Sequence, residues 1–110
     1  MARIRLIRIH CVNKNDVNKE DEININLDGK KFAGTYNIRQ DQKVLLNSKD
    51  YEFTGTVDVQ LVEVDGQVGG NNDDRLGTRH IKDNLEVRDG LVSYEAPGTY
   101  YTLEYSVFLD

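Results

Sequence analysis

Apolar residues alternate with polar residues along most of this 110-residue chain. Side chains two positions apart lie on the same face of a β-strand, so a period of two predicts a strand with one apolar and one polar face. The clearest segments place their apolar residues at Ile23, Ile25 and Leu27; at Val57, Val59 and Leu61; and at Tyr101, Leu103, Tyr105, Val107 and Leu109. A chain with this pattern is expected to build sheets.

Turn residues separate these segments. Asp28-Gly29 follows the first of them and predicts a hairpin turn, because aspartate and glycine tolerate the positive φ that such turns require. The single proline, Pro97, lies between alanine and glycine in a second predicted turn. At the start of the chain, Ile4 and Leu6 share one phase and Ile7, Ile9 and Cys11 the other. A β-bulge near Leu6-Ile7, or burial on both faces, would account for this change of phase.

Shorter strand candidates complete the pattern, and no segment shows helical periodicity for more than one turn. These candidates are Val44-Leu46, Tyr51-Phe53, Leu76-Ile81 and Leu91-Tyr94, together with a return strand that carries Phe32, Tyr36 and Ile38. The sequence therefore predicts an all-β fold, an antiparallel β-sandwich of about eight strands, formed by residues 1–110 as a single domain.

Charge and composition argue against several classes of protein. The net charge is −5, whereas a nucleic-acid binder needs a basic face. No apolar run approaches the roughly 20 residues that span a bilayer, and arginines interrupt the first ten residues where a secretory signal would be apolar. The composition is typical of a soluble protein. The single cysteine, Cys11, excludes an internal disulfide and is expected to be a small buried residue.

Two acidic segments, 13–22 and 63–77, are rich in Asp, Asn and Gly. Calcium takes six to eight oxygen ligands, which two neighbouring loops at one end of a sandwich can supply. Repulsion within Asp73-Asp74 would also favour a bound cation. The alternative is that these residues form ordinary solvated turns, where Asp, Asn and Gly are common.

The same segments resemble the C2 domain, the β-sandwich module of protein kinase C and synaptotagmin. The first segment, from Asp16 to Glu20-Asp21-Glu22-Ile23, is similar to the first calcium loop of that family. The second, from Leu61 through Asp65 to Asp74-Arg75-Leu76-Gly77, is similar to its third loop. The resemblance covers Ile4 to Ile81 and implies calcium as the cofactor. The ligands that it implies are Asp16, Asp21, Asp65 and Asp74, with Asp73 as a close neighbour.

Residues that could act in catalysis are few. The two histidines, His10 and His80, are expected on polar faces or in the core, and no serine lies in a Gly-x-Ser-x-Gly setting. The sequence therefore predicts no catalytic residues and no enzyme. Tyrosines near the C-terminus could stack on sugar rings, although we expect Tyr101 and Tyr105 to pack in the core and Tyr100 to act as a cross-strand partner.

Two hypotheses of different class follow. The first is a calcium-binding module, in which the bound ion orders the acidic loops and favours docking to an anionic lipid surface, a protein or a glycan. The second is a metal-free structural or interaction domain of a larger assembly. The apolar alternation up to Leu109 fits this second hypothesis if the C-terminal strand is an edge that pairs with another chain. A carbohydrate-binding module is a third possibility.

Overall fold

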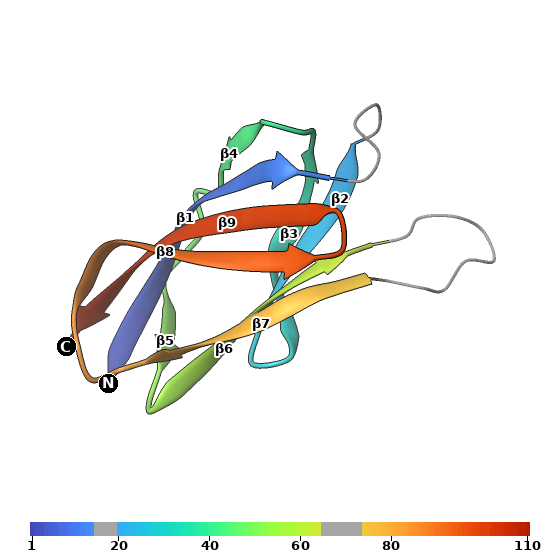
Figure 1. Ribbon diagram of the computed structural model, residues 1–110. Helices are drawn as coiled ribbons and strands as arrows, with labels where there is room; N and C mark the ends of the chain where they lie inside the picture. Colours follow the sequence, from blue (N-terminus) through green and yellow to red (C-terminus); the bar gives the residue numbers. More distant parts are fainter. Residues whose placement is uncertain (15–19, 65–73) are drawn as a thin grey trace.

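The computed structural model describes residues 1–14, 20–64 and 74–110 (Figure 1). Within those ranges the chain forms nine β-strands and no helix. The strands are β1 (Ala2–Asn13), β2 (Asp21–Leu27), β3 (Lys30–Ile38), β4 (Lys43–Leu45), β5 (Tyr51–Phe53), β6 (Thr56–Glu63), β7 (Asp74–Lys82), β8 (Val87–Ala96) and β9 (Thr99–Leu109).

The strands form two antiparallel sheets that pack face to face (Figure 1). The first sheet has the order β4-β1-β9-β8, with β5 also paired to β1, and the second has the order β3-β2-β6-β7. The predicted all-β antiparallel sandwich is therefore confirmed. The count of nine strands differs by one from the expected number of about eight.

The core lies between the two sheets and is formed by the apolar side chains that the strands direct inward. Its largest fully buried side chains are Tyr94, Tyr101, Ile4, Leu6, Ile9, Ile23, Ile25, Leu27, Ile38, Leu61, Leu103 and Val57. Burial of this apolar surface is the main favourable contribution to folding. The period-two pattern thus identified the buried face of both sheets.

A β-bulge interrupts the long first strand. The register between β1 and β9 shifts between Leu6 and Arg8, so Ile4 and Leu6 before the shift and Ile9 and Cys11 after it all point into the core. The extra residue reverses the phase of the side chains, which explains the irregular apolar pattern of this segment. Of the two explanations offered for the change of phase, a β-bulge near Leu6-Ile7 and burial on both faces, the structure shows the bulge.

The predicted hairpin between β2 and β3 is also present. Asp28 has φ 53° and Gly29 has φ 83°, the left-handed values that a two-residue hairpin turn requires. The side chain of Asp28 adds two contacts, because it accepts hydrogen bonds from the backbone N–H of Asp58 at 2.9 Å and from the Tyr51 hydroxyl at 3.0 Å. The turn is thereby fixed against the neighbouring strand and against β5.

One expectation about the sheet edges is wrong. The C-terminal strand β9 is an interior strand, hydrogen-bonded to β1 on one side and to β8 on the other. Its strong apolar alternation reflects its central position in the core. In the sheet path, β8 is the terminal strand on that side, so an edge that could accept another chain is provided by β8 and not by the C-terminus.

Tyr94 links the two sheets through a buried hydrogen bond. Its ring lies in the core, and its hydroxyl donates to the backbone carbonyl of Val59, 2.9 Å away on the opposite sheet. Burial raises the pKa of this phenol, which keeps it protonated as a donor.

We expect Tyr94→Phe to lower the free energy of unfolding by about 1 kcal/mol, the usual net value of one buried hydrogen bond. Urea unfolding monitored by circular dichroism measures the loss. Tyr51→Phe is the matched control, because its hydroxyl bonds to Asp28 in an exposed setting and its removal should cost less. If both variants lose the same free energy of unfolding, burial does not strengthen the contribution of the Tyr94 hydrogen bond.

Candidate functional site

Described residues of the two acidic segments meet at one end of the sandwich. The backbone N–H of Val64, just after β6, donates to the carbonyl of Glu22 in β2 at 2.8 Å. Ile23 pairs with Glu63 across the same two strands, and Glu63 pairs in turn with Asp74 at the start of β7. We call this end, formed by the end of β1, the start of β2, the end of β6 and the start of β7, the acidic end.

Of the five predicted calcium ligands, two lie among the described residues and three do not. Asp16, Asp65 and Asp73 lie outside the described residues. The backbone of Asp74 begins β7 at the acidic end, opposite Glu63. Asp21 begins β2 and is the one predicted ligand whose side-chain contacts are described.

Asp21 belongs to a buried polar cluster, which comprises Cys11, Lys14, Asp21 and Tyr101. The ammonium of Lys14 lies 3.2 Å from Asp21 Oδ1, and the side chains are only 2% and 9% exposed, respectively. The Tyr101 hydroxyl donates a hydrogen bond to the other carboxylate oxygen, Oδ2. The Cys11 thiol is buried beside them and contacts the backbone carbonyl of Asn13 at 3.8 Å.

Three strands from both sheets build this cluster. Cys11 and Tyr101 face each other across β1 and β9 in the first sheet, whereas Asp21 comes from β2 in the second sheet. Lys14 follows the last residue of β1. The cluster therefore lies between the sheets at the acidic end, where polar atoms replace the apolar core.

The environment keeps the hydroxyl and the thiol of the cluster protonated. Burial, followed by the hydrogen bond to Asp21, raises the pKa of the Tyr101 phenol. Burial is also the main cause that raises the pKa of the Cys11 thiol. A thiol that stays protonated is a poor nucleophile, so Cys11 acts here as a small buried residue, in agreement with its expected role.

The geometry of Asp21 does not fit a calcium ligand. Both of its oxygens already have partners, and one partner is a cation that would repel a metal ion. Among the described residues, no group of three or more His, Cys, Asp or Glu side chains could hold a metal.

The histidines do not converge on one site, since they lie on different sheets. His10 is in β1, opposite Thr102 and Lys43. His80 is exposed on β7, where its Nδ1 atom contacts Asp58 Oδ1 at 2.5 Å. Among the described residues, no buried nucleophile is seen in contact with this exposed pair.

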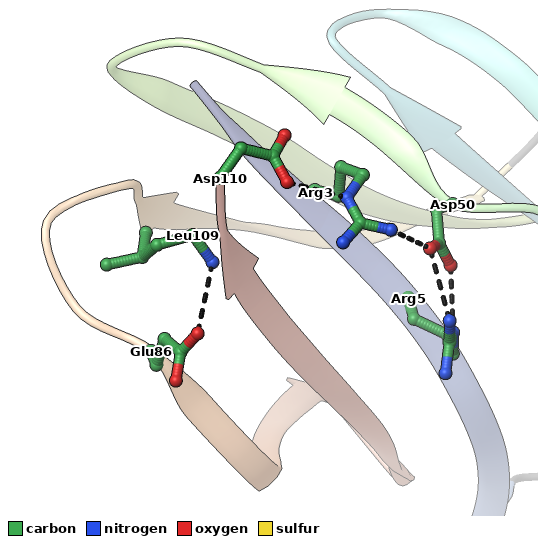
Figure 2. Close-up of polar contacts among 6 residues, drawn as sticks. All are labelled: Arg3, Arg5, Asp50, Glu86, Leu109 and Asp110. Carbon is green, nitrogen blue, oxygen red and sulfur yellow. Dashed lines mark hydrogen bonds and ion pairs between the residues drawn. The ribbon is translucent and has the colours of Figure 1, made fainter.

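The opposite end of the sandwich, where both termini lie, carries an arginine network (Figure 2). Arg3 contacts Asp50 at 2.9 Å and Asp110 at 3.0 Å, and Arg5 contacts Asp50 at 2.8 Å. Both guanidinium groups also lie over the ring of Phe108. The hydrogen bond from Arg5 is the largest cause that lowers the pKa of Asp50. Two arginines face two carboxylates, so this network is balanced in charge and joins β1 to the C-terminus.

An open cleft of about 360 Å³ lies beside the connection between β4 and β5. This volume is at the lower limit of the usual range for small-molecule sites. The lining residues are Phe32, Leu46, Asn47, Ser48 and Lys49. An aromatic ring with neighbouring polar groups is compatible with a sugar, whereas Tyr94 and Tyr101 are fully buried and are not available for stacking.

No protein-family model, no curated protein and no solved structure matches this chain. The resemblance to C2 domains therefore continues to depend on the residues that suggested it. No helix among the described residues is long and apolar enough to cross a membrane.

Proposed function

We propose that this chain is a non-enzymatic binding module that binds calcium at the acidic end. The observation that supports this proposal is the hydrogen bond between Val64 and Glu22, because it joins a described residue of one acidic segment to a described residue of the other. Segments far apart in the sequence can then contribute oxygens to one ion.

The proposed ligands are Asp16, Asp65, Asp73 and Asp74. Asp21 is left out, because its contacts with Lys14 and Tyr101 give it a structural role. Binding of a divalent cation would offset the repulsion among the carboxylates and favour an anionic partner, which we propose to be a lipid surface, a protein or a glycan.

Calcium should stabilise the folded chain. A ligand at 100 times its dissociation constant adds about 2.7 kcal/mol to the free energy of unfolding, because it binds only the folded state. For a domain of this size we expect the midpoint of thermal unfolding to rise by roughly 10 °C, with magnesium producing a smaller shift. The measurement compares metal-stripped protein with and without millimolar calcium.

Two variants test the ligand set. Asp74→Asn should weaken the calcium-induced shift, because a neutral amide replaces a charged ligand. Asp110→Asn is the matched control, since it makes the same change at the opposite end of the sandwich. The ligand set is wrong if the two variants retain the same calcium response as the unaltered chain.

A metal-free interaction domain is the second candidate function. It is favoured by the pairing of Asp21 with Lys14, which neutralises that carboxylate without a metal ion. The terminal strand β8 also exposes 61% of Leu91, and such an edge can pair with a strand of a partner. Absence of any calcium-induced shift in the unfolding midpoint would favour this candidate.

A further inference from the structure

The buried polar cluster places a primary amine directly against a carboxyl group. Lys14 Nζ lies 3.2 Å from Asp21 Oδ1, and both side chains are almost completely excluded from solvent. A buried ion pair is costly, because the attraction between the charges seldom exceeds what they lose in hydration. Transfer of one proton from the ammonium to the carboxylate removes both charges and leaves an amine beside a carboxylic acid.

We propose that Lys14 and Asp21 condense into an intramolecular isopeptide bond. The bond would join Nζ of Lys14 to Cγ of Asp21 and release one molecule of water. The reaction needs no oxidant, reductant or external co-reactant, because both reacting groups are held in contact by the fold. It is distinct from calcium binding and independent of it.

The atoms and electrons balance in three steps. The Lys14 ammonium gives one proton to Asp21 Oδ1, and the freed lone pair of Nζ then forms a bond to Cγ while the carbonyl electron pair moves to Oδ2. The carbonyl at Oδ2 re-forms as the C–Oδ1 bond breaks. Oδ1 takes a second proton from the nitrogen and leaves as water, so an amide with one N–H remains and no atom changes its oxidation state.

Tyr101 is positioned to assist this reaction as a catalytic residue. Its hydroxyl donates to Oδ2, the oxygen on which negative charge develops when the amine attacks. Burial and the contact with Asp21 raise the pKa of this phenol, so it remains a donor throughout. Tyr101 is itself fully buried and paired with Cys11 in the sheet, which holds its ring in place.

Proximity and dehydration supply the driving force. Groups held in contact by a rigid framework react with effective concentrations of about 10⁵–10⁸ M, provided that the attacking and attacked atoms are aligned. Both side chains are almost completely buried, which disfavours hydrolysis of the product. The bond would connect the end of β1 in one sheet to the start of β2 in the other, and would tie the two sheets together beneath the acidic end.

Mass spectrometry of the intact, full-length chain tests the proposal. We expect a mass lower than the sequence mass by one water, after allowance for the state of the N-terminal methionine. Digestion with trypsin should give the peptides 9–19 and 20–30 joined to each other, because an acylated lysine is not cleaved and cleavage after Lys19 separates the two partners. Fragmentation of the joined peptide should locate the bond at Lys14 and Asp21.

Lys14→Arg is the matched control, since it retains the positive charge but removes the amine. We expect this variant to show the unaltered sequence mass and separate peptides, while its circular dichroism reports that the sandwich has formed. Tyr101→Phe should lower the yield of joined peptide at a given time after refolding. A Tyr101→Phe chain that joins as fast as the unaltered chain would exclude the catalytic role of the hydroxyl.

The unaltered chain provides the decisive result, and it does not depend on how well any variant folds. If folded protein retains its full sequence mass after prolonged incubation, and Lys14 is cleaved normally by trypsin, then the pair is an ordinary ion pair and the proposal is overturned. Calcium-induced stabilisation could still be observed in that case, so the two proposals fail separately.

Discussion

Asp21→Ala should lower the free energy of unfolding by about 3–5 kcal/mol, the usual loss when one partner of a buried ion pair is removed. The substitution leaves the Lys14 amine in a dry site and removes the acceptor of the Tyr101 hydroxyl. Each of these buried groups would then lose a contact that compensates for its lost hydration. The expectation holds for an ion pair and for an amide, because either form requires the Asp21 carboxyl group.

Equilibrium unfolding in urea measures this effect, with Glu22→Ala as the control. Glu22 is the next residue along β2, but it is exposed, and the contact that it makes with Val64 uses its backbone carbonyl. Its replacement should change the stability by less than about 0.5 kcal/mol. A loss below about 1 kcal/mol for Asp21→Ala would show that water or rearranged side chains compensate at the cluster.

The sequence contained enough information to predict the sheets, because alternation is a local property. Ile23, Ile25 and Leu27 had to share one face of β2 in any sheet. The change of phase near Leu6 was equally visible, and the bulge that it predicted is present. Sheet order, by contrast, depends on contacts between distant segments. Nothing local to Leu109 distinguishes an edge strand from the interior strand that β9 forms.

The candidate site illustrates the same difference between local and distant information. Asp21 was predicted as a calcium ligand because its segment resembles the first calcium loop of C2 domains. Its parity with Ile23 and Ile25 was a signal that it points inward, and the structure places it there. Its partners Lys14 and Tyr101 could not be identified, because Lys14 follows the end of another strand and Tyr101 lies in a strand 80 residues away.

The polar cluster also shows how burial can be reconciled with charge at the end of a sandwich. At the acidic end a polar cluster takes the place of the apolar core, and the sequence there is rich in Asp and Asn. Lys14, Asp21 and Tyr101 satisfy one another's polar atoms and close the core at that point. The contacts within this cluster do not require a metal ion. The cluster is therefore compatible both with a calcium site at the acidic end and with a metal-free interaction surface there.

Leu103→Ala should lower the free energy of unfolding by about 2–5 kcal/mol. Leu103 is fully buried at the centre of β9, the strand that holds β1 and β8 together. Truncation removes apolar contacts and leaves a cavity that the rigid sheets on both sides can fill only in part. The loss should appear as a lower urea midpoint with an unchanged slope, because the unfolded chain exposes nearly the same surface.

Leu91→Ala makes the same chemical change on the neighbouring strand. It is the control that shows whether the loss of stability comes from the burial of the leucine. Leu91 is 61% exposed and lies on β8 opposite Glu104, one residue from the partner position of Leu103. Its replacement should alter the stability by less than about 0.5 kcal/mol. Similar losses for both variants would indicate that Leu91 is covered in solution.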